Sequence, residues 1–134
     1  MKLLVMGSGM MGSAAAFDMA RIPQVDSVTL ADSDARRARE VAARVNRITG
    51  ERRVRAVQLN ARDEKAAAKL MHGHDAALSA VPYFLNLGLA RAAVEAGYAD
   101  QAHLTRECRT LTGVSPASLR RRAGLGSARG PRTP

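Results

Sequence analysis

With 134 residues the chain has the length of one domain, and 46% of its residues are hydrophobic while 3% are aromatic. No stretch approaches the ~20 consecutive apolar residues of a membrane span, and the single cysteine, Cys108, excludes an intramolecular disulfide and a cysteine-based metal cluster. The net charge of +9 is concentrated at one end, because residues 101–134 carry seven Arg and one Glu. We therefore expect a soluble, cytoplasmic protein with a basic C-terminal segment.

The first predicted strand, residues 2–6, runs directly into the sequence Gly7-Ser8-Gly9-Met10-Met11-Gly12. A strand, this G-x-G-x-x-G turn and a following helix, predicted here over residues 13–21, form the arrangement that binds dinucleotides. Gly7 permits the tight turn, Gly9 lets a pyrophosphate approach the backbone, and Gly12 lets the helix pack on the strand. The N–H groups at the helix start would face the phosphates.

The second predicted strand, residues 27–31, ends at Asp32, which lies 20 residues after Gly12. A carboxylate at this place accepts hydrogen bonds from the adenosine ribose and repels a 2′-phosphate, which favours NAD. Arg36 and Arg37 follow, and they either face solvent or bind the 2′-phosphate of NADP. The pattern predicts NAD or NADP as the cofactor, with NAD slightly favoured.

Helices and strands continue to alternate along the next part of the chain. We expect helices over residues 34–48, 63–71 and 84–96, and strands over 53–59 and 75–81. Four strand–helix units imply right-handed crossovers and an α/β fold with a doubly wound parallel sheet, whose ligand lies beyond the carboxyl ends of the strands. The last helix is expected to be pinned on the sheet by its apolar side chains, namely Phe84, Leu85, Leu87, Leu89, Ala92 and Val94.

The runs GSGMMG, LADSDARRAREVA, VQLNARD and DAALSAVPYFLNLGLARAAVEAG resemble the nucleotide-binding half of the saccharopine dehydrogenase family, over residues 1 to about 97. The resemblance implies a Rossmann domain of an NAD(P)-dependent oxidoreductase. It places residues 80–82 beside the nicotinamide ribose and residues 60–63 near the adenine. The family's substrate domain is missing from this sequence, so we expect a truncated oxidoreductase domain, without an assigned catalytic residue or substrate.

The residues predicted to bind the cofactor come from the glycine turn and from the ends of the three other strands. They are Gly7, Ser8, Gly9, Met10, Met11, Gly12, Asp32, Ser33, Arg37, Asn60, Ala61, Ala80, Val81 and Pro82.

Residues 89–122, with the run AVEAGYADQAHLTRECR followed by LTGVSP, resemble the second helix-turn-helix of AraC/XylS-type transcription regulators. The resemblance implies an alternative function, DNA binding, through a recognition helix that carries Gln101, His103, Thr105, Arg106 and Arg109. Because the preceding helix would already pack on the sheet, we expect at most weak, salt-sensitive binding. The chain then divides into a Rossmann domain (1–97), a short basic helical segment (98–122) and a disordered tail (123–134).

Four further side chains have a chemical and a structural interpretation. His72 and His74 have only Asp75 as a nearby third ligand, so no metal site is predicted. Cys108 is expected to be a packed residue, since no base is positioned beside it. Tyr83 is a proton donor near the nicotinamide or, in the simpler interpretation, a residue that lines or packs at the pocket.

Overall fold

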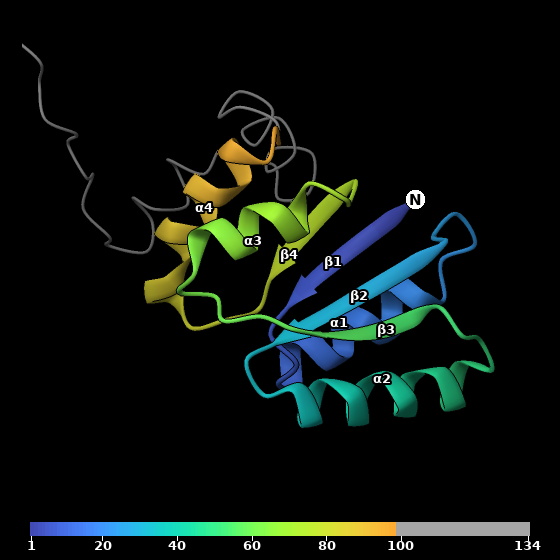
Figure 1. Ribbon diagram of the computed structural model, residues 1–134. Helices are drawn as coiled ribbons and strands as arrows, with labels where there is room; N and C mark the ends of the chain where they lie inside the picture. Colours follow the sequence, from blue (N-terminus) through green and yellow to red (C-terminus); the bar gives the residue numbers. More distant parts are fainter. Residues whose placement is uncertain (99–134) are drawn as a thin grey trace, which may run out of the picture. The chain divides into compact units, whose positions relative to one another are not determined.

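The computed structural model describes residues 1–98, and these form a parallel sheet between two pairs of helices (Figure 1). The elements follow one another as β1 (Lys2–Met6), α1 (Met10–Ala20), β2 (Ser27–Asp32), α2 (Ala35–Thr49), β3 (Val54–Gln58), α3 (Glu64–Met71), β4 (Ala76–Ser79), the 3-10 turn η1 (Tyr83–Leu85) and α4 (Asn86–Glu95). The four strands lie in the order β3-β2-β1-β4, and all pairs are parallel. The predicted α/β fold with a doubly wound parallel sheet is confirmed.

Strand β1 lies inside the sheet, which explains its uninterrupted apolar sequence. Its neighbours are β2, with Leu4 opposite Thr29, and β4, with Leu4 opposite Ala77. Leu4 and Val5 are fully buried, one toward each face of the sheet. The end of β1 is therefore held from both sides at the point where the glycine turn begins.

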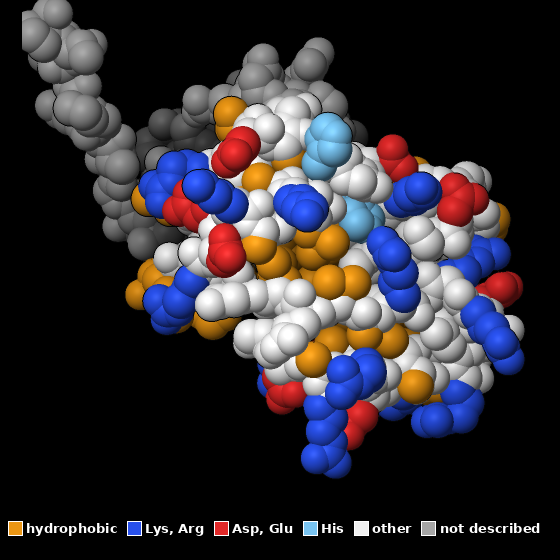
Figure 2. Space-filling view, viewed as in Figure 1, with side chains coloured by type: hydrophobic (Ala, Val, Ile, Leu, Met, Phe, Trp, Pro, Cys, Tyr) orange, Lys and Arg blue, Asp and Glu red, His pale blue; other side chains and the backbone are white. Residues whose placement is uncertain are grey.

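Each face of the sheet has its own apolar core. Helices α1 and α2 cover one face, where Val5, Leu30 and Val41 meet, and α3 and α4 cover the other, where Leu4, Met71 and Leu89 meet (Figure 1). Helix α2 is amphipathic as predicted, with Ala38, Val41, Ala42 and Val45 buried and its arginines on the outside. Figure 2 shows Lys and Arg side chains along the edge that α2 occupies.

Three details differ from the sequence-based predictions. Helix α1 begins at Met10 rather than at residue 13, because the second half of the glycine motif is itself helical. The strand expected over residues 75–81 is shorter, since it ends at Ser79, and a 3-10 turn separates Pro82 from α4. Of the side chains expected to pin the last helix, Leu89 and Ala92 are buried, whereas Phe84, Leu87 and Val94 are 57%, 69% and 70% exposed.

Helix α4 does pack on the core, but Phe84, Leu87 and Val94 were wrongly included among the side chains that hold it, for a geometric reason. A helix lying on a sheet buries only one stripe of residues three and four apart, and Leu89 and Ala92 occupy this stripe. Leu87 and Val94 point away from it, and Phe84 belongs to η1 rather than to the helix. Among the helices of residues 1–98, none is long and apolar enough to cross a membrane.

Candidate functional site

The glycine turn joins β1 to α1 in a conformation that requires glycine at two of its positions, residues 7 and 12. Gly7 has φ +101°, and its N–H donates to the carbonyl of Ala31 at 2.7 Å. A Cβ atom on Gly7 would lie 2.5 Å from the carbonyl oxygen of Ala80, and one on Gly12 would overlap the carbonyl oxygen of Gly7. A Cβ atom on Gly9 would meet nothing within 4 Å. Gly7 and Gly12 thus allow close backbone packing, while Gly9 faces open space.

The open space beside Gly9 lies at the start of helix α1. Gly9 is the N-cap residue, and no side chain caps the helix there. The first N–H groups of a helix have no partner inside it and carry partial positive charge, which suits an anionic group. The side chains of the next two residues, Met10 and Met11, are 90% and 76% exposed and are not part of the core.

Asp32, at the end of β2, is buried and bonded to the glycine turn. Its Oδ2 accepts the backbone N–H and the hydroxyl of Ser8, both at 2.7 Å, and Nη2 of Arg37 at 2.9 Å. Its Oδ1 accepts the backbone N–H of Asp34 at 2.8 Å. Burial by itself raises the pKa of Asp32, but the hydrogen bonds from Ser8, Asp34 and Arg37 outweigh it and hold the pKa well below its usual range. The carboxylate is therefore ionised at neutral pH.

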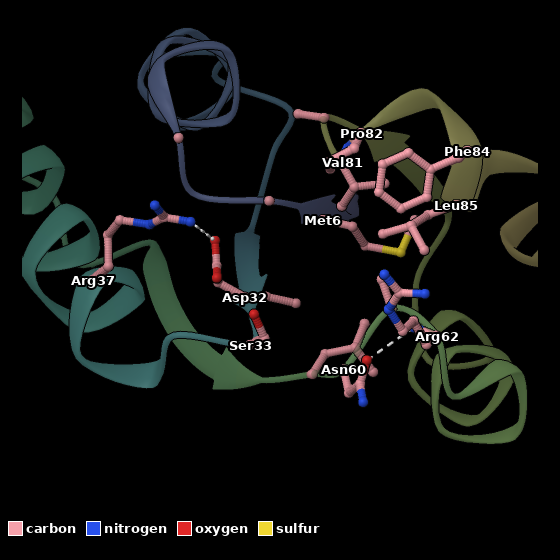
Figure 3. A pocket seen from close by; sticks show the side chains of 16 residues that line it. Met6, Asp32, Ser33, Arg37, Asn60, Arg62, Val81, Pro82, Phe84 and Leu85 are labelled. Carbon is pink, nitrogen blue, oxygen red and sulfur yellow. Dashed lines mark hydrogen bonds and ion pairs between the residues drawn. The ribbon is translucent and has the colours of Figure 1, made fainter.

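Arg37 extends from the first turn of α2 across the end of β2 (Figure 3). Its Nε donates to the hydroxyl of Ser8 at 3.2 Å, and its guanidinium forms the ion pair with Asp32. The side chain is 53% exposed while that of Asp32 is 5% exposed. Ser8, Asp32 and Arg37 thus form one network, with the carboxylate inside and the cation at the surface.

A cavity of about 470 Å³ lies along the carboxyl edge of the sheet, where residues from the ends of all four strands meet (Figure 3). Most residues predicted to bind the cofactor line it, namely Gly7, Gly9, Asp32, Ser33, Arg37, Asn60, Ala61, Ala80, Val81 and Pro82. Ser8 and Met10 line a neighbouring hollow of about 430 Å³, together with Arg37 and Arg44. Met11 and Gly12 line neither.

Arg62, Phe84 and Leu85 also line the larger cavity, and none of them was among the residues predicted to bind the cofactor. Arg62 does lie in the segment 60–63 that the family resemblance placed near the adenine. Phe84 was assigned to the core, but it is exposed and points toward the cavity wall (Figure 3). Tyr83 is 86% exposed, lies edge-on to Phe84 and does not line the cavity.

The two histidines have different surroundings. His74 is buried, with Nδ1 2.8 Å from the carbonyl oxygen of Leu70 and Nε2 2.8 Å from the hydroxyl of Thr29. A carbonyl only accepts, so Nδ1 carries a proton, and in the neutral ring Nε2 accepts from the hydroxyl of Thr29. His72 is exposed. Within residues 1–98, no three His, Cys, Asp or Glu side chains form a group able to hold a metal ion.

A parallel sheet, a glycine turn into a helix, and an acidic residue at the end of the second strand define a nicotinamide-dinucleotide-binding domain of the Rossmann class. The family model "Saccharopine dehydrogenase NADP binding domain" matches residues 3–129, and the chain belongs to this family. The match extends past residue 97, where the sequence-based resemblance ended.

Three solved structures show the same fold. Apo saccharopine dehydrogenase (L-Glu forming) from Saccharomyces cerevisiae aligns over 72% of this chain and 20% of its own, with 21% identity and a TM-score of 0.60. A UDP-glucose-4-epimerase from Stenotrophomonas maltophila, with bound NAD, aligns over 73% of this chain and 34% of its own, with 29% identity and a TM-score of 0.62. Quinate dehydrogenase from Corynebacterium glutamicum, in complex with NAD, aligns over 92% of this chain and 54% of its own, with 17% identity and a TM-score of 0.53. This chain therefore spans between a fifth and about half of these proteins.

None of these matches supports the resemblance to AraC/XylS-type regulators. The residues predicted to contact DNA, Gln101, His103, Thr105, Arg106 and Arg109, and also Cys108, lie outside the described residues. In the described part, Leu89 and Ala92 of α4 are buried in the core, so the helix that would precede the recognition helix already packs within the Rossmann domain.

Proposed function

We propose that the domain binds NAD along the carboxyl edge of the sheet and is the cofactor-binding part of an NAD-dependent oxidoreductase of saccharopine dehydrogenase type. The observation that supports this most is the convergence of Gly9, Asp32 and Val81 on one cavity, although they lie at or just beyond the ends of three different strands. When bound, the nicotinamide supplies the hydride chemistry, and the residues of this chain bind and orient the cofactor.

The proposed pose follows from the chemistry of the lining residues. The pyrophosphate lies against Gly9, where no side chain occupies the space beside the start of α1. The adenosine ribose lies at Asp32 and Ser33, and the adenine extends toward Asn60 and Ala61. The nicotinamide ribose lies near residues 80–82, as the family resemblance implies.

Asp32 is the reason for preferring NAD. Among the described residues, its Oδ1 accepts only the N–H of Asp34, so it retains capacity for a ribose hydroxyl. A 2′-phosphate would bring further negative charge beside an ionised carboxylate whose cationic partner, Arg37, is already engaged.

Arg37 also supports the second candidate, NADP. Its guanidinium is half exposed and lines both hollows, and only Nε and Nη2 are used by Ser8 and Asp32. The N–H groups that remain are able to donate to a phosphate. Arg36 is a weaker candidate, because its Nε pairs with Glu40 at 3.1 Å on the outer face of α2.

Titration with NADH and NADPH separates these alternatives. We expect wild type to bind NADH more tightly than NADPH. In Asp32→Ala the affinity for NADH should fall on the order of tenfold to a hundredfold, and the difference in affinity between NADH and NADPH should become smaller. Arg37→Ala would weaken NADPH more than NADH if Arg37 binds the 2′-phosphate. Equal losses for both cofactors in Asp32→Ala, with folding intact by circular dichroism, would show that Asp32 does not contact the ribose.

DNA binding through residues 101–109 and a cytoplasmic location stay predictions from the sequence. For DNA we expect weak binding, with a dissociation constant on the order of 10⁻⁴ to 10⁻⁶ M that rises with salt and is equal for any duplex. Fluorescence anisotropy with a candidate duplex and its scramble at two salt concentrations checks this. A thousandfold preference for one duplex would favour a regulator instead.

A further inference from the structure

Arg62 and Phe84 meet at one end of the cavity, although they follow strands at opposite edges of the sheet. Arg62 lies in the loop after β3, and Phe84 lies in η1 after β4. The guanidinium carbon of Arg62 lies 5.6 Å from the centre of the Phe84 ring. This contact joins the two loops that form the cavity wall (Figure 3).

The backbone that carries Arg62 is held in a fixed turn. The N–H of Arg62 donates to Oδ1 of Asn60 at 3.0 Å, and the N–H of Asp63 donates to the carbonyl of Asn60 at 2.9 Å. Asp63 also caps α3, since its Oδ1 accepts the N–H of Ala66 at 3.0 Å. The turn therefore fixes the backbone position of Arg62, so that only the rotamer of the Arg62 side chain can vary.

The charge of Arg62 has no carboxylate partner among the described residues, whereas Arg36, Arg37, Arg53 and Arg91 each pair with one. Its guanidinium lies over the face of the exposed Phe84 ring. A planar guanidinium stacks on flat π-systems and is weakly hydrated, so a heteroaromatic base is a suitable ligand for it.

The part of the cavity beside Arg62 is lined by apolar side chains, which suits the flat face of a base. Met6 and Leu85 form an apolar surface there, while the charged groups Asp32 and Arg37 lie at the other end (Figure 3). A nucleotide whose ribose reaches Asp32 would therefore place its base between this apolar surface and Arg62.

We propose that Arg62 and Phe84 form a clasp for the adenine of the dinucleotide. The Arg62 guanidinium stacks on the base, and the Phe84 ring holds this guanidinium in place at the end of the cavity. The inference rests on the proposed function and names the residue that recognises the adenosine half. Arg62 binds the cofactor, and Phe84 is a positioning residue that acts through Arg62.

The test compares four variants by calorimetric titration with NADH and with ADP-ribose. We expect Arg62→Ala to weaken both ligands on the order of tenfold, and Arg62→Lys to recover only part of the loss because an ammonium has no plane to stack. Phe84→Leu should weaken both ligands about twofold to fivefold. Arg39→Ala removes another exposed positive charge, from α2, and this variant should bind both ligands like wild type.

A spectroscopic measurement separates stacking from general attraction to the phosphates. The chain has no Trp and only two Tyr, so the adenine absorption band of bound ADP-ribose is observable in difference spectra. We expect reduced absorbance at this band with wild type, and loss of that change in Arg62→Ala at saturating ligand. Full recovery by Arg62→Lys, or an unchanged band, would show a charge effect and overturn the clasp.

The clasp and the proposed function fail in different ways. If wild type binds NADH and Arg62→Ala binds it equally well, the clasp is wrong and the dinucleotide site stands. If folded wild type binds neither NADH nor ADP-ribose, both are wrong. Thermal unfolding followed by circular dichroism confirms that each variant is folded before titration.

Discussion

A Cβ atom built on Gly12 would overlap the carbonyl oxygen of Gly7, so the first turn of α1 touches the backbone at the end of β1. We expect Gly12→Ala to destabilise the domain by about 2 kcal/mol or more, because the obstacle is backbone and cannot rotate away. Urea denaturation followed by circular dichroism measures the change.

The matched control for this variant is Gly9→Ala in the same motif. Its Cβ atom meets nothing within 4 Å and its φ is −69°, which any residue adopts, so the free energy of unfolding should change by less than about 1 kcal/mol. Equal destabilisation by the two variants would contradict the assigned roles of these glycines.

The burial of Asp32 beside Ser8 and Arg37 predicts a pH-dependent contribution to stability. The pKa of Asp32 is below its ordinary value of 3.8 in the folded protein. Its hydrogen bonds therefore stabilise the fold above about pH 4, and this contribution is lost as the pH falls through the folded pKa. We expect Asp32→Asn to cost about 1 to 3 kcal/mol at pH 7, and the difference from wild type to shrink toward pH 3. A difference that is constant from pH 7 to pH 3 would be inconsistent with an ionised, bonded carboxylate.

His74 links the end of α3 to the sheet, and we expect His74→Ala to cost about 2 to 3 kcal/mol. The variant would leave the carbonyl of Leu70 without its side-chain donor and the hydroxyl of Thr29 without its acceptor, in a buried place. The exposed neighbour His72 provides the control, and His72→Ala should change stability by less than about 0.5 kcal/mol. Similar effects of the two variants on the unfolding midpoint would refute this account of His74.

Local sequence patterns sufficed to predict the succession of strands and helices along the chain, the glycine turn and the position of Asp32 at the end of the second strand. These features depend on residues close together in the chain, on apolar periodicity and on the special conformation of glycine. The partners of Asp32 were not predictable in the same way, because Ser8 lies 24 residues before it and meets it only when β1 and β2 pair.

The contact between Arg62 and Phe84 was missed for a related reason. Phe84 follows Pro82 and precedes a helical pattern, so its apolar side chain was counted with the core-facing residues of α4. In the structure η1 turns it toward the loop after β3, which belongs to the opposite edge of the sheet. Periodicity within one helix contains no information about such a contact between loops.

The central claim is that the cavity at the glycine turn binds a nicotinamide dinucleotide, and titration of NADH fluorescence with wild type and Gly9→Val tests it most directly. The Cβ atom of a valine at residue 9 would enter the open space proposed for the pyrophosphate without meeting other atoms of the domain, and the two methyl groups would narrow that space further. We predict saturable binding of NADH by wild type and no detectable binding by a Gly9→Val variant that unfolds at a similar temperature. Absence of binding to wild type with NADH and NADPH at millimolar concentration, or equal affinity of Gly9→Val, would contradict the claim.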